Sequence, residues 1–330
     1  MSSGAIRKCA FRYGLQFILP ALLCSAILPT VGAAALVEGS LPWFSVTPSG
    51  SFEVANSPRF KNRPLYGPHN GALILTGDRP ITHLADDTYL YGGFLFGVVR
   101  DGAGVWAHNA DDMASAFQQG SMRWSLRDSL LPGVDISARV LSGDTGTSMV
   151  IDANVSVSDA AELVWAFGCG TTPQVSGNRL GWVYDPLINP KTLNWTFSPE
   201  DCVGNNVTVD SAGLSLQFGA SRRVRVSLET AGKLGSIAVK DARQWQNLTS
   251  LAQSAGAAPN DAPLGVGRSP LAAMQTMRFT WSVVVSPPDA PAPAAEQAPL
   301  AQLAAAASRL EALTRTRAAT PDPLVNAPCS

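Results

Sequence analysis

The sequence is poor in histidine, and its charges favour neither sign. It has 3 histidines in 330 residues, and its 24 basic residues nearly balance 25 acidic ones. The histidines are spread over His69, His83 and His108, so no HxxxH or CxxC spacing exists to hold zinc, and we predict no metal and no cofactor. The basic residues are scattered, whereas a surface that follows a phosphate backbone needs clustered Lys and Arg, so nucleic acid is not an expected partner.

Long apolar runs are missing after the first 35 residues. Within them, Arg7, Lys8 and Arg12 precede the apolar run GLQFILPALLCSAILPTV, and the small residues GAAA follow. This order is typical of a secretory signal peptide over residues 1–35, and we expect the mature chain to begin near Leu36. No later run reaches the roughly 20 apolar residues of a membrane span. We therefore predict a soluble protein exported to the periplasm or the extracellular space.

Cysteine is scarce in the expected mature chain. Of five cysteines, Cys9 and Cys24 lie in the predicted signal peptide. In an oxidising compartment Cys169 and Cys202 are the natural partners for a disulfide, because both lie in loops of the folded region, whereas Cys329 is the penultimate residue. The sequence leaves the bond between Cys169 and Cys202 open.

Amphipathic helices that alternate with strands are absent from most of the chain, which argues against a βαβ protein. From Leu41 to about Val285, short segments rich in β-branched and aromatic residues follow one another, among them GGFLFGVVR, SMRWSLRD and MRFTWSVVVS. Turn pairs such as Asn70-Gly71 separate them at the spacing of antiparallel hairpins. These segments are more numerous than the roughly seven to nine strands of an immunoglobulin-type domain. We predict an all-β fold, a large antiparallel, supersandwich-like β-sandwich over residues 36–286.

Most tryptophans lie within strand-like runs, and we expect Trp124, Trp165 and Trp281 in the core. One helix is expected inside the sandwich, over residues 241–257, unless this stretch is a surface excursion. After the sandwich we predict a Pro/Ala-rich linker over residues 287–299 and a disordered tail over residues 319–330. Between them, residues 300–318 predict a carboxy-terminal helix that is either isolated or docks onto a partner; its leucines fall on one side, at Leu300, Leu303, Leu310 and Leu313.

The stretch NRPLYGPHNG has two interpretations. Pro64 and Pro68 make it a stiff corner, because proline fixes φ and cannot donate to a sheet. In the first interpretation the corner is an edge that contacts a sugar through donors and an aromatic face, at Asn62, Arg63, Tyr66 and His69. In the second, which we favour, Arg63 pairs with Asp78 of the nearby GDRP turn and locks a scaffold.

Acidic residues give no convincing catalytic pair. Glycoside hydrolysis needs two carboxyl groups about 5–10 Å apart, and adjacent acids on a strand point to opposite faces. Asp185, in GWVYDPL, is the one acid set among aromatic residues, beside Trp182 and Tyr184. No GxSxG nucleophile motif is present. We therefore predict no catalytic residue, and we assign Trp182, Tyr184 and Asp185 as candidate sugar contacts.

Four motifs follow one another along the chain: NRPLYG at residues 62–67, GDRP at residues 77–80, WAFGCG at residues 165–170 and SPEDCVGN at residues 198–205. In this order they resemble a family of large exported bacterial proteins catalogued as domain of unknown function 4450, over about residues 50–285. In members of that family this region is an amino-terminal β-sandwich followed by a helical toroid. This chain has one helix where the toroid would begin, and Cys169 where the family tends to place glycine.

The resemblance implies a carbohydrate-associated protein from polysaccharide-degrading bacteria. We expect a non-catalytic accessory or binding module, with a polysaccharide or oligosaccharide as ligand. The alternative is a subunit or remnant of a glycoside hydrolase-like enzyme whose helical catalytic domain is lost or is a separate chain that docks on the helix of residues 300–318. A structural envelope protein without a small ligand is a third possibility.

Overall fold

The structure, a computed structural model, describes residues 44–47, 50–56, 63–68, 72–86, 88–118, 120–144, 146–171, 197–219, 222–232, 235–254, 261–286 and 298–313. One compact unit, Pro42–Ser330, contains every element described below, and the other, Met1–Leu41, lies outside the described residues. The predicted signal peptide, the predicted tail and residues 287–297 of the predicted linker also lie outside them.

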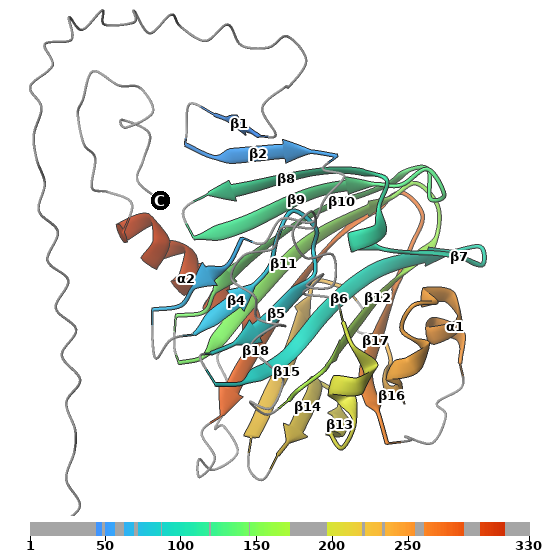
Figure 1. The fold of residues 1–330 in the computed structure, drawn as a ribbon. Helices are drawn as coiled ribbons and strands as arrows, with labels where there is room; N and C mark the ends of the chain where they lie inside the picture. Colours follow the sequence, from blue (N-terminus) through green and yellow to red (C-terminus); the bar gives the residue numbers. More distant parts are fainter. Residues whose placement is uncertain are drawn as a thin grey trace, which may run out of the picture. The chain divides into compact units, whose positions relative to one another are not determined.

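Ten strands form one antiparallel sheet in the order β1-β2-β8-β9-β10-β11-β18-β15-β14-β13 (Figure 1). Strands β8 to β11 follow one another as a meander, and β18 then joins the sheet from near the end of the chain. The strands are β1 (Ser45–Val46), β2 (Phe52–Ala55), β8 (Asp112–Gln118), β9 (Ser121–Arg127), β10 (Val134–Ser142), β11 (Ser148–Val157), β13 (Asn206–Asp210), β14 (Gly213–Phe218), β15 (Arg222–Thr230) and β18 (Gln275–Ser286).

The second sheet has eight strands, with β7 paired to β6 beside the order β16-β17-β12-β6-β5-β4-β3. Its strands are β3 (Leu65–Tyr66), β4 (Leu73–Leu75), β5 (Thr82–Ala85), β6 (Leu90–Arg100), β7 (Ala103–Trp106), β12 (Ala161–Gly168), β16 (Ile237–Asp241) and β17 (Pro263–Leu271). Its pairings are antiparallel as well. The predicted all-β fold, a large antiparallel sandwich, is confirmed.

The main core lies between the two sheets and follows from the alternation of side chains along each strand. In β9, Met122, Trp124 and Leu126 are buried, while Arg123 and Arg127 between and after them are exposed. Burial of such alternate apolar side chains is the main favourable term in folding, roughly 25 cal/mol per Å². The face of β9 that points away from the core is therefore left polar.

Aromatic side chains join the two sheets at the centre of this core. The ring of Trp281, on β18, lies 5.1 Å from the ring of Phe94 and 6.4 Å from that of Trp165, both on the opposite sheet. Trp124, Trp165 and Trp281 are each at most 2% exposed, which confirms the prediction that they are core residues.

The eight-stranded sheet carries a second apolar layer on its outer face. Leu95, Val164 and Val266 form one cluster with Leu248 and Leu251 of helix α1 (Leu248–Gln253). Strand β6 is therefore apolar on both faces and reads as a nearly continuous hydrophobic run. In the region where a helix was predicted, residues 241–257, the structure has the 3-10 turn η3 (Ala242–Gln244) followed by α1, whose amino end is capped by the Asn247 side chain.

The carboxy-terminal helix α2 (Pro299–Leu313) packs against the outer face of the ten-stranded sheet. Leu303 and Ala306 are buried in a cluster with Leu141 and Val150. The apolar side that was considered for a partner domain thus contacts the chain's own sheet, while Leu313 stays 64% exposed. Neither described α-helix combines the length and the hydropathy that crossing a membrane requires.

Candidate functional site

The corner at residues 63–68 contains the ion pair that its scaffold interpretation requires. Arg63 Nε donates to Asp78 Oδ1 over 2.7 Å, and the Asp78 side chain is 1% exposed. The Arg63 backbone N–H also donates to the Thr76 carbonyl, at 2.7 Å. Tyr66, in contrast, is 67% exposed on β3. The structure thus engages Arg63 within the chain and leaves Tyr66 open to a ligand.

The structure does not describe the other five predicted contact residues. Asn62 and His69 at the corner, and Trp182, Tyr184 and Asp185 in the later loop, lie outside the described residues. Their assignment as ligand contacts stays a prediction.

Cys169 and Cys202 are close in space, as predicted, and both are free thiols. Their Sγ atoms lie 3.5 Å apart, Cys169 Sγ donates to the Ser198 carbonyl at 3.0 Å, and burial raises the pKa of the Cys169 thiol. Cys169 follows β12 with φ of 67°, in the left-handed region that favours glycine. Glycine would adopt this backbone conformation without strain. The disulfide itself stays a prediction.

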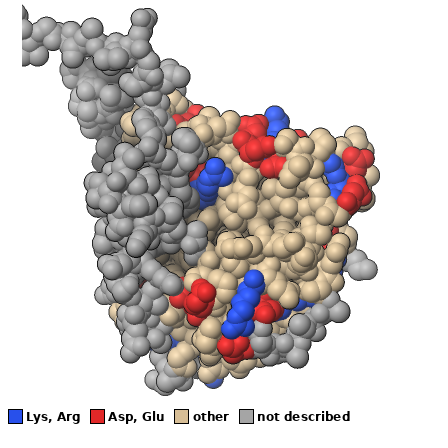
Figure 2. Space-filling view, turned by 45° about the vertical axis from the view of Figure 1, so that its right-hand side comes forward, with Lys and Arg blue, Asp and Glu red and all other residues tan. Residues whose placement is uncertain are grey.

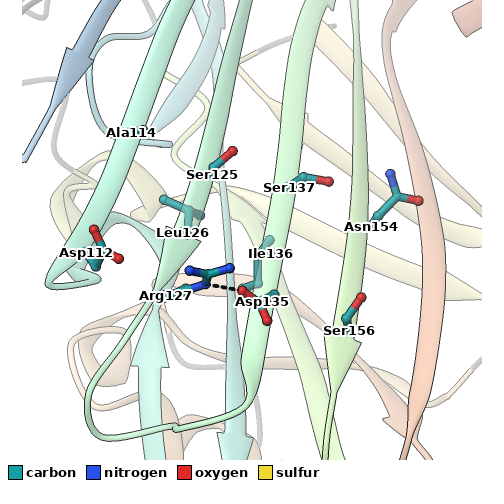
Figure 3. A pocket seen from close by; sticks show the side chains of 10 residues that line it. All are labelled: Asp112, Ala114, Ser125, Leu126, Arg127, Asp135, Ile136, Ser137, Asn154 and Ser156. Carbon is teal, nitrogen blue, oxygen red and sulfur yellow. Dashed lines mark hydrogen bonds and ion pairs between the residues drawn. The ribbon is translucent and has the colours of Figure 1, made fainter.

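The outer face of the ten-stranded sheet holds a polar surface that the sequence analysis missed. The register aligns Ser125 on β9 with Ser137 on β10, Ser137 with Asn154 on β11, and Asn154 with Arg278 on β18. We call this line the serine row. Figure 3 shows the Ser125, Ser137 and Asn154 side chains on three neighbouring strands. Hydroxyl, amide and guanidinium groups therefore share one surface.

A second row on the same face lies two residues away from the serine row on each strand. It aligns Arg123 on β9 with Arg139 on β10, Arg139 with Asp152 on β11, and Asp152 with Thr280 on β18. We call this line the arginine row. It ends the open part of the face, because Leu141 and Val150, the next outward residues on β10 and β11, lie under α2.

Asp152 is the anchor of the arginine row. Its side chain is 6% exposed. Its carboxylate accepts hydrogen bonds from Arg139 Nε at 3.2 Å, Thr280 Oγ1 at 3.0 Å and Arg278 Nε at 2.8 Å. Arg278 Nη2 adds a bond of 3.2 Å, and the paired carboxylate raises the pKa of the Arg278 guanidinium. A carboxylate this deeply buried is costly unless it is paired and hydrogen-bonded, and these contacts meet that requirement. The two guanidinium groups are consequently held in place.

Two adjoining hollows lie over these rows and share Ser125, Ser137 and Asn154. The first, which we call the aspartate hollow, measures about 380 Å³ and includes Asp112 and the exposed pair of Arg127 and Asp135. The second, the arginine hollow, measures about 450 Å³ and is lined by Arg123, Trp124, Ser125, Ser137, Ala138, Arg139, Asp152, Asn154 and Arg278. Both volumes are of the size of small-molecule sites, about 300–1,000 Å³.

This surface can form many hydrogen bonds to a polar ligand. Guanidinium groups only donate, carboxylates only accept, and hydroxyl and amide groups do both, which is the set that a saccharide's hydroxyl groups require. Within the described parts of the chain, no three His, Cys, Asp or Glu side chains are grouped as metal ligands. On the face shown in Figure 2, charges of both signs are dispersed over a mostly uncharged surface.

The alternation in SMRWSLRD would have placed Arg123, Ser125 and Arg127 on an outward face. Which strands lie beside them could not be read locally, because Asp152 and Arg278 meet through the pairing of β11 with β18. The sequence therefore indicated which side chains point outward, but it did not indicate which strands bring them together into a site.

The fold and this surface define an antiparallel two-sheet β-sandwich protein with an open polar face. A family model described as Domain of unknown function (DUF4450) matches residues 90–281. The chain belongs to this family, which confirms the predicted resemblance, and the match begins after the motifs at residues 62–67 and 77–80.

No curated protein matches the chain. Among solved structures it is similar to one named as a kojibiose phosphorylase from the human microbiome, with 8% identity and a TM-score of 0.40 over 86% of this chain. It is similar to a bacterial glucoamylase complexed with acarbose, with 7% identity and a TM-score of 0.43 over 78% of this chain. A heparinase III matches with 9% identity and a TM-score of 0.30 over 52% of this chain and 20% of its own. The chain spans 38% of the first two structures.

Proposed function

We propose that this chain is an exported, non-catalytic β-sandwich protein that binds a polysaccharide or oligosaccharide on the outer face of its ten-stranded sheet. The observation that supports this proposal is the serine row between two adjoining hollows. Ser125, Ser137 and Asn154 present neutral donors and acceptors over three strands, next to fixed guanidinium groups. Such an array suits a chain of hydroxyl-bearing rings, which needs many bonds of moderate strength.

The accessibility of the polar rows on the outer face of the ten-stranded sheet also supports binding. Helix α2 covers Leu141 and Val150, so the apolar part of the outer face is closed while the polar rows stay open. A rigid sheet presents its side chains with little cost of ordering, which favours affinity.

The test is binding of the mature chain to a panel of neutral and acidic polysaccharides by calorimetry and affinity electrophoresis. We expect Asn154→Ala to weaken binding about 10-fold, by removing hydrogen bonds at the centre of the site. The matched control is Asn206→Ala, an exposed asparagine on β13 at the far edge of the same sheet, which should bind as the wild type does. Absence of binding to every polysaccharide would refute the proposal.

The second candidate is a subunit of a glycoside hydrolase-like enzyme that docks a separate helical domain on α2. Leu300 and Leu313 are 37% and 64% exposed, and these are the apolar side chains of α2 that a partner would cover. We rank this candidate lower, because Leu303 and Ala306 are already buried against the sheet. Co-expression with a helical protein encoded nearby, followed by size-exclusion chromatography, would detect the complex, and Leu313→Glu should weaken it.

A further inference from the structure

The two hollows differ in charge. In the arginine hollow three guanidinium groups, those of Arg123, Arg139 and Arg278, face the single carboxylate of Asp152, which leaves two positive charges in excess. In the aspartate hollow Asp112 and Asp135 outnumber Arg127. Glu229, on neighbouring β15, also lies near Arg278, and its carboxylate accepts the Leu300 N–H of α2 at 3.0 Å. A ligand that crosses both hollows meets a positive end and a negative end.

Arg123 and Arg139 are directly opposed on neighbouring antiparallel strands and project from the same face. Like charges at such positions destabilise a sheet. Arg139 is paired with Asp152 at 3.2 Å, but Arg123 makes no ion pair or hydrogen bond with the described parts of the chain. Its charge faces the hollow without compensation, which is the kind of local conflict expected at a binding site.

The guanidinium groups keep donors free for a ligand. Arg139 uses its Nε toward Asp152, and its two Nη atoms have no partner among the described residues. Arg278 uses Nε and Nη2 in the same way, which leaves its Nη1. Because Asp152 holds both side chains, the remaining N–H groups are preorganised for the planar, bidentate contact that guanidinium forms with carboxylate.

We propose that the arginine hollow binds the carboxylate of an acidic saccharide, a uronic acid unit, between Arg123 and the fixed pair of Arg139 and Arg278. Ser137 and Asn154 then bond to hydroxyl groups of the same sugar chain. The net negative charge of the aspartate hollow disfavours a second anionic unit. The two hollows should therefore bind a chain of alternating acidic and neutral units more tightly than a uniform polyanion. This inference rests on the proposed function and names its ligand class.

The experiment compares acidic polymers with the same polymers after reduction of their carboxyl groups. Calorimetry of the mature chain should show affinity at least 10-fold higher for native glucuronoxylan, which carries acidic units on a neutral chain, than for its reduced form. Polygalacturonate and alginate, which are uniform polyanions, should bind more weakly than native glucuronoxylan. The affinity of the native polymer should fall as salt rises, because charge interactions are screened.

Arg123→Gln should lower affinity for the acidic polymer about 10-fold and leave affinity for the reduced polymer unchanged. The same substitution should leave the free energy of unfolding equal or higher, because it removes the opposed positive charges, and a merely structural arginine would not behave so. The matched control is Arg223→Gln, an exposed arginine on β15 of the same sheet, which should change neither property.

Equal affinity for native and reduced polymers, with Arg123→Gln binding as the wild type, would overturn the inference and leave the proposed function standing. Binding to neutral polymers alone would have the same meaning. Absence of binding to every polymer, neutral or acidic, would overturn both.

Discussion

Arg63 Nε lies 2.7 Å from Asp78 Oδ1, and this bond joins the amino-terminal corner to the turn that follows β4. The Asp78 side chain is 1% exposed and that of Arg63 is 23% exposed, so the pair is mostly removed from solvent. Removing one member of such a pair leaves a buried charge, and the penalty exceeds the gain that the pair itself provides.

Arg63→Ala should therefore lower the free energy of unfolding by about 2–4 kcal/mol. Denaturant titration followed by tryptophan fluorescence measures this change. Arg243→Ala, which breaks a solvent-exposed pair with Asp261, is the control and should have no measurable effect. If Arg63→Ala instead weakens saccharide binding at unchanged stability, the corner is a ligand site and not a scaffold.

Gly267 and Trp165 pair across β17 and β12, and a side chain at Gly267 would meet the indole ring. A Cβ atom there would lie 2.1 Å from Trp165 Cε2, in a core that cannot yield easily. Gly267→Ala should lower the free energy of unfolding by about 1–3 kcal/mol through overpacking. Thermal unfolding of the variant measures the loss.

Ser269→Ala, on the same strand, is the matched control. The Ser269 hydroxyl is buried without a hydrogen-bond partner in the described part of the chain, so its removal should leave stability equal or slightly raised. Equal losses in both variants would show that β17 tolerates no change, and would refute the specific role of the indole ring.

Local patterns predicted the faces of the strands well, and distant pairing lay beyond them. SMRWSLRD shows by alternation which residues point inward, and Arg63 and Asp78 could be paired because they are near in sequence. Asp152 and Arg278 could not, because β11 and β18 are brought together only by the fold as a whole. A one-residue change of register would turn every side chain to the other face, so the site depends on a property that no local pattern specifies.

The buried histidines predict a loss of stability in mild acid. Burial lowers the pKa of His83 from 6.5 to about 4, and burial together with the nearby Arg79 lowers the pKa of His108 to about 4. Between pH 6.5 and 4 the unfolded chain binds protons that the folded chain does not, so stability falls as the pH falls through this window. From pH 7 to pH 5 the loss should be about 2 kcal/mol for each histidine.

Denaturant titrations at pH 7, 6 and 5 test this prediction. His83→Gln and His108→Gln should each flatten the dependence on pH, and the double variant should flatten it most, whatever the absolute stability of each protein. An unchanged slope in the double variant would assign the acid sensitivity to carboxylates instead.

The cysteine pair predicts a disulfide that forms without rearrangement of the fold. The Sγ atoms of Cys169 and Cys202 are 3.5 Å apart and buried, so oxidised glutathione, acting during folding, should convert the two thiols to one disulfide and be reduced to two glutathione thiols. The two cysteines are 33 positions apart in the sequence. A disulfide that closes a loop of this length should raise the free energy of unfolding by about 3–4 kcal/mol. Mass spectrometry should show the loss of two hydrogens, and unfolding with and without reductant should show the difference in stability.

Cys169→Gly removes the thiol that the bond requires. Because Cys169 has φ of 67°, glycine fits the backbone at this position. The variant should therefore fold and lose all response of its stability to reductant. A wild-type protein that keeps both thiols after folding in oxidised glutathione would rule the disulfide out. In that case burial of the pair protects the thiols from oxidation, and the tight packing of Cys169 against Cys202 has a structural role alone.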